Sequence, residues 1–459
     1  MPVFDVGRTI DLCPLTPPRD PMTTIAIPHL YRVEGHGGIR VEVGPDGATQ
    51  VQSDIFEGSR FFEVLLVGQP VEAVPGIVSR VCSICSAAHT LTSVAALEDA
   101  LGIEVDTEVQ ALRDLLNVGE TIESHALHLF ALAAPDAVGA TGILAMAQTH
   151  HDAVVKGLNI KRVGNLIQER IGGRAIHPMN ITVGGAGLFP DREVLTALTS
   201  EVAQAREDAD ALLGLVETLI EATPQPGPKL WVALEPEGAG YGLRGKRLLA
   251  TGFEPVGLAD FRSRVHEHVV GHSTAKQSLY AKQPFMVGAA ARCFHSGARL
   301  DGAAGALWRR WQPMWEQAGS GANHAGQYIE LVWALERALT LIEQIALHAG
   351  RRPDPVLRTR PSGQGVAALE VPRGTLFHAY TVENGVVTDC DIVTPTAQNL
   401  ASLEQDIERL TGRWWGGAGA GGTGDQAPLR RELEMLARAY DPCISCATHL
   451  IDLRVRHEG

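Results

Sequence analysis

Two short cysteine motifs near opposite ends of the chain most constrain how it can fold. One reads CSIC at residues 82–85 and the other reads CISC at 443–446, and a histidine, His89 or His449, follows each. Cys85, the last cysteine of the first motif, and Cys443, the first of the second, are 443 − 85 = 358 positions apart. Thiolates are soft, strong ligands for zinc, nickel, copper and iron, and two such pairs offer four of them. We therefore expect a fold that brings both ends of the chain to one metal centre.

Spacing alone leaves other interpretations of these motifs open. Four cysteines can hold a structural zinc ion. Such ions usually fold a small module whose cysteine pairs are close in sequence, and this chain, with 45% apolar residues, has ample material for its own core. A redox dithiol is a further alternative, although two motifs that are each followed by a histidine fit it poorly.

Composition narrows the class of protein. A length of 459 residues favours two or more lobes, and a net charge of −14 without any Lys/Arg-rich run argues against nucleic acid and anionic membranes as partners. We see no apolar run long enough to span a bilayer and no signal peptide. Seven cysteines are an odd number, so a disulfide framework is a poor interpretation. Cys13, Cys293 and Cys390 stand alone and are typical of buried apolar residues.

Hydrophobic periodicity predicts an α+β fold that is mainly α, with a central bundle of long helices and small antiparallel β lobes. We expect an N-terminal β lobe at 24–68, a helical bundle at 80–350, a β/turn lobe at 353–397, and C-terminal helices with the metal motif at 398–449. The expected helices follow the first motif up to Gly102 and then occupy 108–134, 143–171, 190–222, 258–282, 302–317, 325–348, 398–411 and 427–440. The glycine-rich run 416–424 formally contains GxGxxG, but no βαβ pattern surrounds it, so we interpret it as a linker.

The two motifs also support a family resemblance. RxCxxCxxxH at 80–89 and DPCxxCxxH at 441–449 are similar to the paired signatures of the large subunit of [NiFe] hydrogenases. The resemblance extends through 32–36, Glu63, 370–374 and 395–396. The residues within the two motifs are most similar to those of the cytoplasmic, multisubunit, pyridine-nucleotide-linked hydrogenases, which are also called sulfhydrogenases.

The resemblance implies a nickel–iron centre. Cys82 and Cys443 would be terminal ligands of nickel, while Cys85 and Cys446 would bridge nickel and iron. The iron would also carry CO and two cyanides, which separate maturation proteins build. Such a pair splits H2 into a hydride and a proton.

The resemblance also assigns residues around the metals. Glu34 would be the first proton relay from Cys443; the alternative is a surface glutamate paired with Arg32. Arg373 would lie over the open face of the metals; the alternative is a surface arginine that caps a turn. The remaining assignments place Pro372 and Thr396 in the cyanide pocket and put His89 near a bridging thiolate, unless it is simply a satisfied core histidine.

A second ion and a cleaved tail are implied near the C-terminal motif. Glu63, His449 and the backbone carbonyl of Ile392 would hold Mg²⁺ or iron. An endopeptidase would cut after His449 and release 450–459.

Electrons must leave such a centre, yet no further cysteine cluster could hold an iron–sulfur centre. The resemblance therefore implies an iron–sulfur small subunit and flavin subunits that carry electrons to NAD(P), all in the cytoplasm. An alternative relative is the quinone-site subunit of respiratory complex I, which shares the fold but lacks the metal cysteines.

Overall fold

A computed structural model describes residues 23–44, 47–315, 317–416 and 425–448 of the chain. The predictions for Cys13, for the linker residues 417–424, for His449 and for the tail 450–459 therefore lie outside the described residues.

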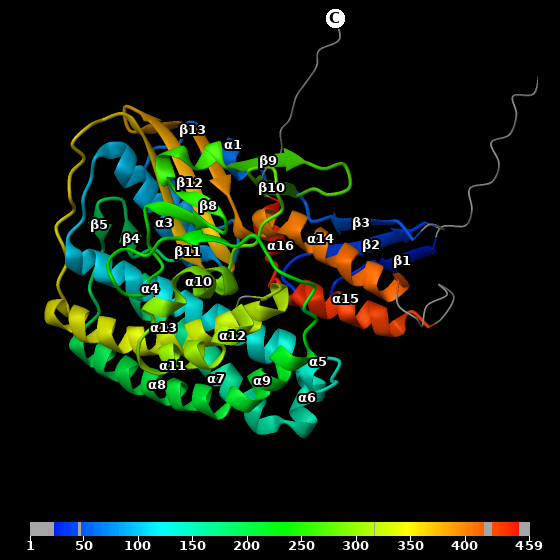
Figure 1. The fold of residues 1–459 in the computed structure, drawn as a ribbon. Helices are drawn as coiled ribbons and strands as arrows, with labels where there is room; N and C mark the ends of the chain where they lie inside the picture. The colour runs from blue at the N-terminus through cyan, green and yellow to red at the C-terminus, as the bar shows by residue number, and fades with distance from the viewer. Residues whose placement is uncertain (1–22, 45–46, 316, 417–424, 449–459) are drawn as a thin grey trace, which may run out of the picture.

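Four long helices pack together as a bundle in the lower part of the view in Figure 1. They are α4 (Thr107–Ala126), α7 (His151–Gly172), α8 (Arg192–Ala211) and α13 (Asn323–Ile345), which pack against one another through α4–α7, α4–α13, α7–α8 and α8–α13 contacts. Regularly spaced leucines explain this packing, because Leu112 and Leu116 of α4 and Leu331 and Leu335 of α13 are all fully buried. The first half of α13 also buries polar side chains, which places these groups inside the protein.

Shorter helices surround this bundle. The α-helices are α1 (Phe62–Leu66), α2 (Val74–Val78), α3 (Ser86–Leu101), α5 (Ala134–Ala137), α6 (Ile143–Thr149), α9 (Leu213–Ala222), α10 (Ala289–Ser296), α11 (Gly302–Arg310), α12 (Gln312–Trp315), α14 (Pro395–Gly416), α15 (Ala427–Ala439) and α16 (Ile444–Ala447). A π-helical segment, η1 (Leu127–Ala133), continues α4, and 3-10 turns form η2 (Leu258–Ser263), η3 (Gly297–Arg299), η4 (Ser320–Ala322) and η5 (Ala346–His348). As expected, α3 ends before Gly102, whose φ of 66° is the left-handed conformation that glycine adopts most easily. No helix in the described ranges has the length and apolar character needed to cross a membrane.

All the sheets are small and antiparallel. The strands pair as β1 (Thr23–Ile27), β2 (Gly37–Val43) and β3 (Thr49–Ile55); β4 (Ile181–Thr182) and β5 (Gly185–Ala186); β6 (Val232–Leu234), β7 (Arg247–Ala250) and β8 (Phe253–Gly257); β9 (Val265–Val269) and β10 (Lys276–Tyr280); and β11 (Gly363–Val371), β12 (Gly374–Glu383) and β13 (Val386–Val393). Helix α3 lies against β11 and β12, while α14 packs on β3 and β10 (Figure 1). The predicted class, a mainly helical α+β fold with small antiparallel sheets, is confirmed.

Two local predictions are wrong. The segment 258–282 is not a helix but the 3-10 turn η2 followed by the hairpin of β9 and β10. Its apolar residues Leu258, Phe261 and Val265 have helical spacing, but the alternation along Val265–Val269 is that of a strand. The N-terminal strands end at Ile55, and α1 occupies part of the stretch for which we expected sheet.

Candidate metal centre

The structure brings the four motif cysteines together. The Sγ atom of Cys443 lies 3.1 Å from that of Cys82, 3.0 Å from that of Cys446 and 3.9 Å from that of Cys85. All four sulfur atoms lie within 4.8 Å of one another and all four residues are buried. Within the described part of the chain, no other group of three or more potential metal ligands is found. The expected convergence of the two ends is therefore confirmed.

Backbone contacts hold the two motifs in this position. Cys85 precedes the first turn of α3, and Cys443 precedes α16. The N–H of Ile444 donates to the carbonyl of Glu34 (3.0 Å), which pairs the C-terminal motif with the N-terminal region. Gly35 makes this approach possible, because a Cβ atom there would lie 2.7 Å from Cβ of Ile444.

Arg60 joins the two motifs directly. Its guanidinium donates to the carbonyl of Val81, beside the first motif, and to the carbonyl of Ser445 (2.8 Å), inside the second. We did not predict this residue, and its sequence context gives no signal for it.

Glu34 touches the sulfur of Cys443. Its Oε2 atom lies 3.2 Å from that sulfur and accepts the backbone N–H of Ser445 (3.0 Å), while its Oε1 atom accepts the hydroxyl of Ser445. The alternative, an ion pair between Glu34 and Arg32, is not what the structure shows, because Arg32 pairs with Asp136. The half-buried carboxyl thus lies between the buried sulfurs and the outside of the protein.

Arg373 is not a surface residue that caps a turn; its side chain is 2% exposed. It lies in the turn between β11 and β12 and donates to the Sγ atom of Cys85 (3.5 Å), the hydroxyl of Ser124 (3.1 Å), and both the backbone carbonyl (2.9 Å) and carboxylate (3.0 Å) of Asp441. Burial acts to lower the pKa of Arg373, but the charge of Asp441 and the neighbouring cysteines hold it well above its ordinary value. A permanent cation therefore lies beside the sulfurs.

Asp441 and Ser124 are site residues that we missed. Asp441 stands in the C-terminal motif, so the motif itself could have indicated it, whereas Ser124 carries no signal in the sequence. Gln327 of α13 also donates to the carboxylate of Asp441 (2.9 Å). Burial acts to raise the pKa of Asp441, but Arg373 lowers it below its usual range, so the carboxylate stays ionised.

Thr396 and His89 also lie at the cysteines. The hydroxyl oxygen of Thr396, in the first turn of α14, accepts the N–H of Cys443 (2.9 Å). Nε2 of His89 lies 3.8 Å from the sulfur of Cys446, and its Nδ1 lies 3.2 Å from Nε2 of His378. Pro372 directly precedes Arg373 in the same turn.

Glu63 and Ile392, two of the residues expected at the second ion, lie in contact. The Oε1 atom of Glu63 accepts the backbone N–H of Ile392 (2.8 Å), and the expected role of the Ile392 carbonyl as an ion ligand stays a prediction. Burial raises the pKa of Glu63 to about 7. His449, the third residue of this expected site, lies outside the described residues.

The donor set fits a soft transition metal. Four buried sulfurs at these separations can converge on one or two ions, and no carboxylate or imidazole takes part in the group. Geometry alone also fits zinc. The isolated cysteines are different: Cys293 is buried beside the carbonyl of Gly326, and the half-buried Cys390 donates to the carbonyl of Glu63 (3.2 Å), as small packing residues do.

Comparisons with known proteins distinguish among these metals. The model of the family "nickel-dependent hydrogenase" matches residues 60–161 and 272–449, which contain both cysteine motifs. The chain is 37% identical to sulfhydrogenase 1 subunit alpha of Pyrococcus furiosus over 429 residues, covering 94% of this chain and 98% of that one. It is 36% identical to sulfhydrogenase 2 subunit alpha of the same organism, with 94% and 100% coverage.

Solved structures agree with this result. The chain is similar to an NAD+-reducing [NiFe]-hydrogenase in the H2-reduced state, with a TM-score of 0.82, 26% identity, and coverage of 93% of this chain and 99% of that one. A Ni-Fe-Se hydrogenase from D. vulgaris Hildenborough matches with a TM-score of 0.74 and 22% identity over 94% and 100% of the two chains, which supports the fold alone.

Proposed function

The chain belongs to the nickel-dependent hydrogenase family and is a hydrogenase large subunit, and we propose that it interconverts H2 with two protons and two electrons and exchanges the electrons with NAD(P) through partner subunits. The observation that carries this proposal is the convergence of Cys82, Cys85, Cys443 and Cys446 within 4.8 Å. The same convergence argues against the alternative of a metal-free relative of the complex I subunit.

We assign the four cysteines to a nickel–iron pair. Cys82 and Cys443 would bind nickel terminally, and Cys85 and Cys446 would bridge nickel and an iron that carries CO and two cyanides. When bound, this pair supplies the redox chemistry that cleaves H2 heterolytically. The contribution of the chain is to hold four soft donors in a buried site from which water is excluded.

Glu34 is the proposed proton relay. Its Oε2 atom is 3.2 Å from the sulfur of Cys443, which is within reach of a proton on that sulfur. The bonds to Ser445 fix the carboxyl in this orientation. Because Glu34 is half-buried, it can pass the proton outward.

Arg373, Pro372 and Thr396 are proposed to line the open side of the metals. The guanidinium of Arg373, fixed by Asp441, provides positive charge beside Cys85. Thr396 uses its hydroxyl oxygen to accept the N–H of Cys443, so its hydroxyl hydrogen is available to donate to a cyanide. His89 is proposed to donate to the bridging sulfur of Cys446.

A second ion is proposed beside Glu63. Its carboxylate, a carbonyl of Ile392 and His449 would hold Mg²⁺ or iron and tie down the C-terminal motif. We propose that an endopeptidase then cuts after His449 and removes 450–459. Residues 1–449 would remain as one multi-lobed catalytic unit, because its metal ligands come from both ends.

The partners follow from what the described chain lacks. Outside the four-cysteine group, the described residues offer no cluster for an iron–sulfur centre. The relatives are alpha subunits of hydrogenases, and one structural neighbour reduces NAD+. We therefore propose an iron–sulfur small subunit, flavin-containing diaphorase subunits and a cytoplasmic site, where the nicotinamide pool is found.

Metal analysis and infrared spectroscopy of the purified native complex test this function. The expected result is about one nickel per large subunit, an excess of iron because the proposed partner's iron–sulfur clusters also contain it, and CO and cyanide stretching bands. Zinc alone, without such bands, would refute the proposal.

A further inference from the structure

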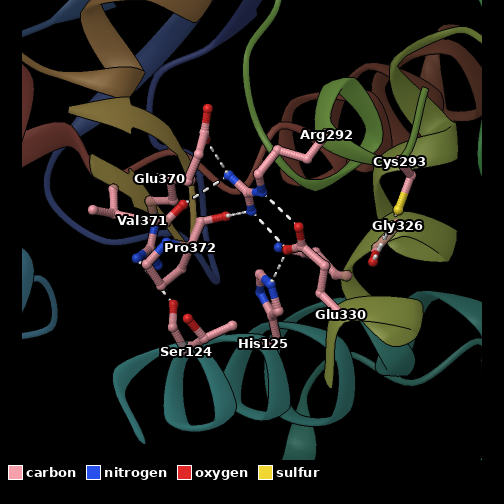
Figure 2. Close-up of polar contacts among 12 residues, drawn as sticks. Ser124, His125, Arg292, Cys293, Gly326, Glu330, Glu370, Val371 and Pro372 are labelled. Carbon is pink, nitrogen blue, oxygen red and sulfur yellow. Dashed lines mark hydrogen bonds and ion pairs between the residues drawn. The ribbon is translucent and has the colours of Figure 1, made fainter. Parts of the chain in front are cut away.

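A second arginine, Arg292 of α10, is buried beside Val371 and Pro372, the two residues that precede Arg373 in the sequence (Figure 2). Its guanidinium has five N–H groups, and all five are used. Nε and Nη2 donate to the two oxygens of Glu330 (2.5 and 2.6 Å), and Nη1 donates to Oε2 of Glu370 (2.8 Å). The remaining two donate to the backbone carbonyls of Val371 (2.9 Å) and Pro372 (3.2 Å).

Both carboxylates are themselves held in place. Oε2 of Glu330 also lies 2.8 Å from Nε2 of His125, on α4, and the hydroxyl of Tyr241 donates to Oε1 of Glu330. Burial acts to raise the pKa of Glu330, but Arg292 lowers it to about 2, so this carboxylate stays ionised.

Glu370, at the end of β11, is anchored in the same manner. It accepts the N–H of Leu234 (2.6 Å) and the hydroxyl of Thr375 (2.8 Å) at its other oxygen. Arg292 therefore links α10, α13 and β11 through groups that have little freedom to move, since Arg292, Glu330 and Glu370 are between 0 and 3% exposed.

The two carbonyls bound by Arg292 lie directly before Arg373 in the sequence. They belong to the tight turn in which Val371 pairs with Gly374. On the other side of this turn, the guanidinium of Arg373 reaches Cys85 at 3.5 Å. A movement of the carbonyls of Val371 and Pro372 would therefore be passed to the groups nearest the sulfurs.

We propose that Arg292 is a positioning residue that fixes the Pro372–Arg373 turn over the four cysteines, and that Glu330 and Glu370 orient it for this task. This inference rests on the proposed function. All five N–H donors of Arg292 are bound to the carboxylates of Glu330 and Glu370 and to the two carbonyls of the turn. Arg292 therefore acts on the metal pair only through the turn.

The test is Arg292→Lys in the complete native complex, observed by infrared spectroscopy of the CO and cyanide bands. Lysine keeps the positive charge but has three donors instead of five, so it cannot hold both carboxylates and both carbonyls. We expect the cyanide bands to be displaced and the rate of H2 oxidation to fall by about a hundredfold, the loss typical of a 1 Å misplacement at a reacting centre.

Arg113→Lys is the matched control. Arg113 is similarly buried, forms a bidentate pair with Glu98 (2.7 and 2.8 Å) and donates to the carbonyls of Thr182 (3.0 Å) and Gly185 (3.1 Å), but it contacts neither the turn nor the cysteines. This control should lower the thermal stability of the complex and leave the infrared bands of the wild type unchanged.

The outcomes are distinguishable. A wild-type complex without CO and cyanide bands contradicts the proposed function itself. Wild-type bands that stay unchanged in Arg292→Lys, or that move equally in Arg113→Lys, overturn the positioning role. If Arg292→Lys does not accumulate, Glu330→Gln carries the same test, because it takes an acceptor from Arg292 and keeps the shape of the side chain; unchanged bands there also overturn the inference.

Discussion

Replacing Glu34 by glutamine should separate proton exchange from metal binding. The carboxylate of Glu34 accepts three contacts, from the N–H and hydroxyl of Ser445 and from the sulfur of Cys443. Glutamine has nearly the same shape and keeps one oxygen acceptor, but its NH2 group cannot take up a proton.

This substitution should affect the stability of the protein and the rate of proton exchange to very different extents. A charge-assisted hydrogen bond is worth about 1 kcal/mol more than a neutral one, so the loss of stability should be about that size. Removing a group that transfers protons lowers a rate by about 10²–10⁴-fold. Proton exchange should therefore fall far more than stability does.

The assay is the formation of HD and D2 from H2 in D2O, measured by mass spectrometry on the native complex. Glu404→Gln is the matched control, because Oε1 of Glu404 accepts the N–H (2.9 Å) and hydroxyl (2.6 Å) of a serine, Ser53, and lies 2.9 Å from Nε2 of His272, with none of the four motif cysteines among these partners. Both variants should keep nickel and iron at the wild-type level and lose similar thermal stability.

Wild-type exchange in Glu34→Gln would show that the relay assignment is wrong. An equal loss of exchange in Glu404→Gln would also contradict the reasoning, because the effect would then come from general destabilisation rather than from the proton path.

Three further substitutions test other parts of the site and its support. Cys443→Ser replaces a soft sulfur by a hard oxygen, so nickel content and H2 turnover should both be lost in metal analysis and hydrogen-uptake assays. Gly35→Ala should lower the free energy of unfolding by more than Gly47→Ala. Both glycines have positive φ (85° and 79°), which costs alanine about 1–2 kcal/mol at either position, but only at Gly35 does the new Cβ atom clash with the C-terminal motif. Equal losses in thermal melts would contradict this. Lys229→Met should cost about 3 kcal/mol, because it leaves the fully buried carboxylate of Asp406 with only the partly exposed Arg409, 3.7 Å away, as its cation, and adding Asp406→Leu should recover most of that loss.

The sequence predicted those features that depend on local pattern or on a distinctive motif. The four cysteines stand in two motifs of high specificity, and the stripe of Leu331 and Leu335 correctly indicated α13. The sequence-based prediction failed where a short apolar pattern fits both the helical and the strand period. At Val265–Val269, pairing with β10 makes the segment a strand.

The network around Arg292 could not be predicted, because its partners Glu330 and Glu370 are 38 and 78 positions away and each is an ordinary charged residue in the sequence. Arg60 is a similar case, since its two acceptors are backbone carbonyls that any residue could supply. Such contacts depend on tertiary packing, which a single sequence does not encode in a local pattern.

The position of the ligands along the chain has a mechanical consequence. An ion bound by both motifs closes a loop of 358 positions, counted from Cys85 to Cys443. By the chain-entropy relation for cross-links, closing a loop of this length disfavours the unfolded chain by about 6 kcal/mol. A metal centre held by these four cysteines would thus also serve as a cross-link, and its removal would free the two motifs from each other.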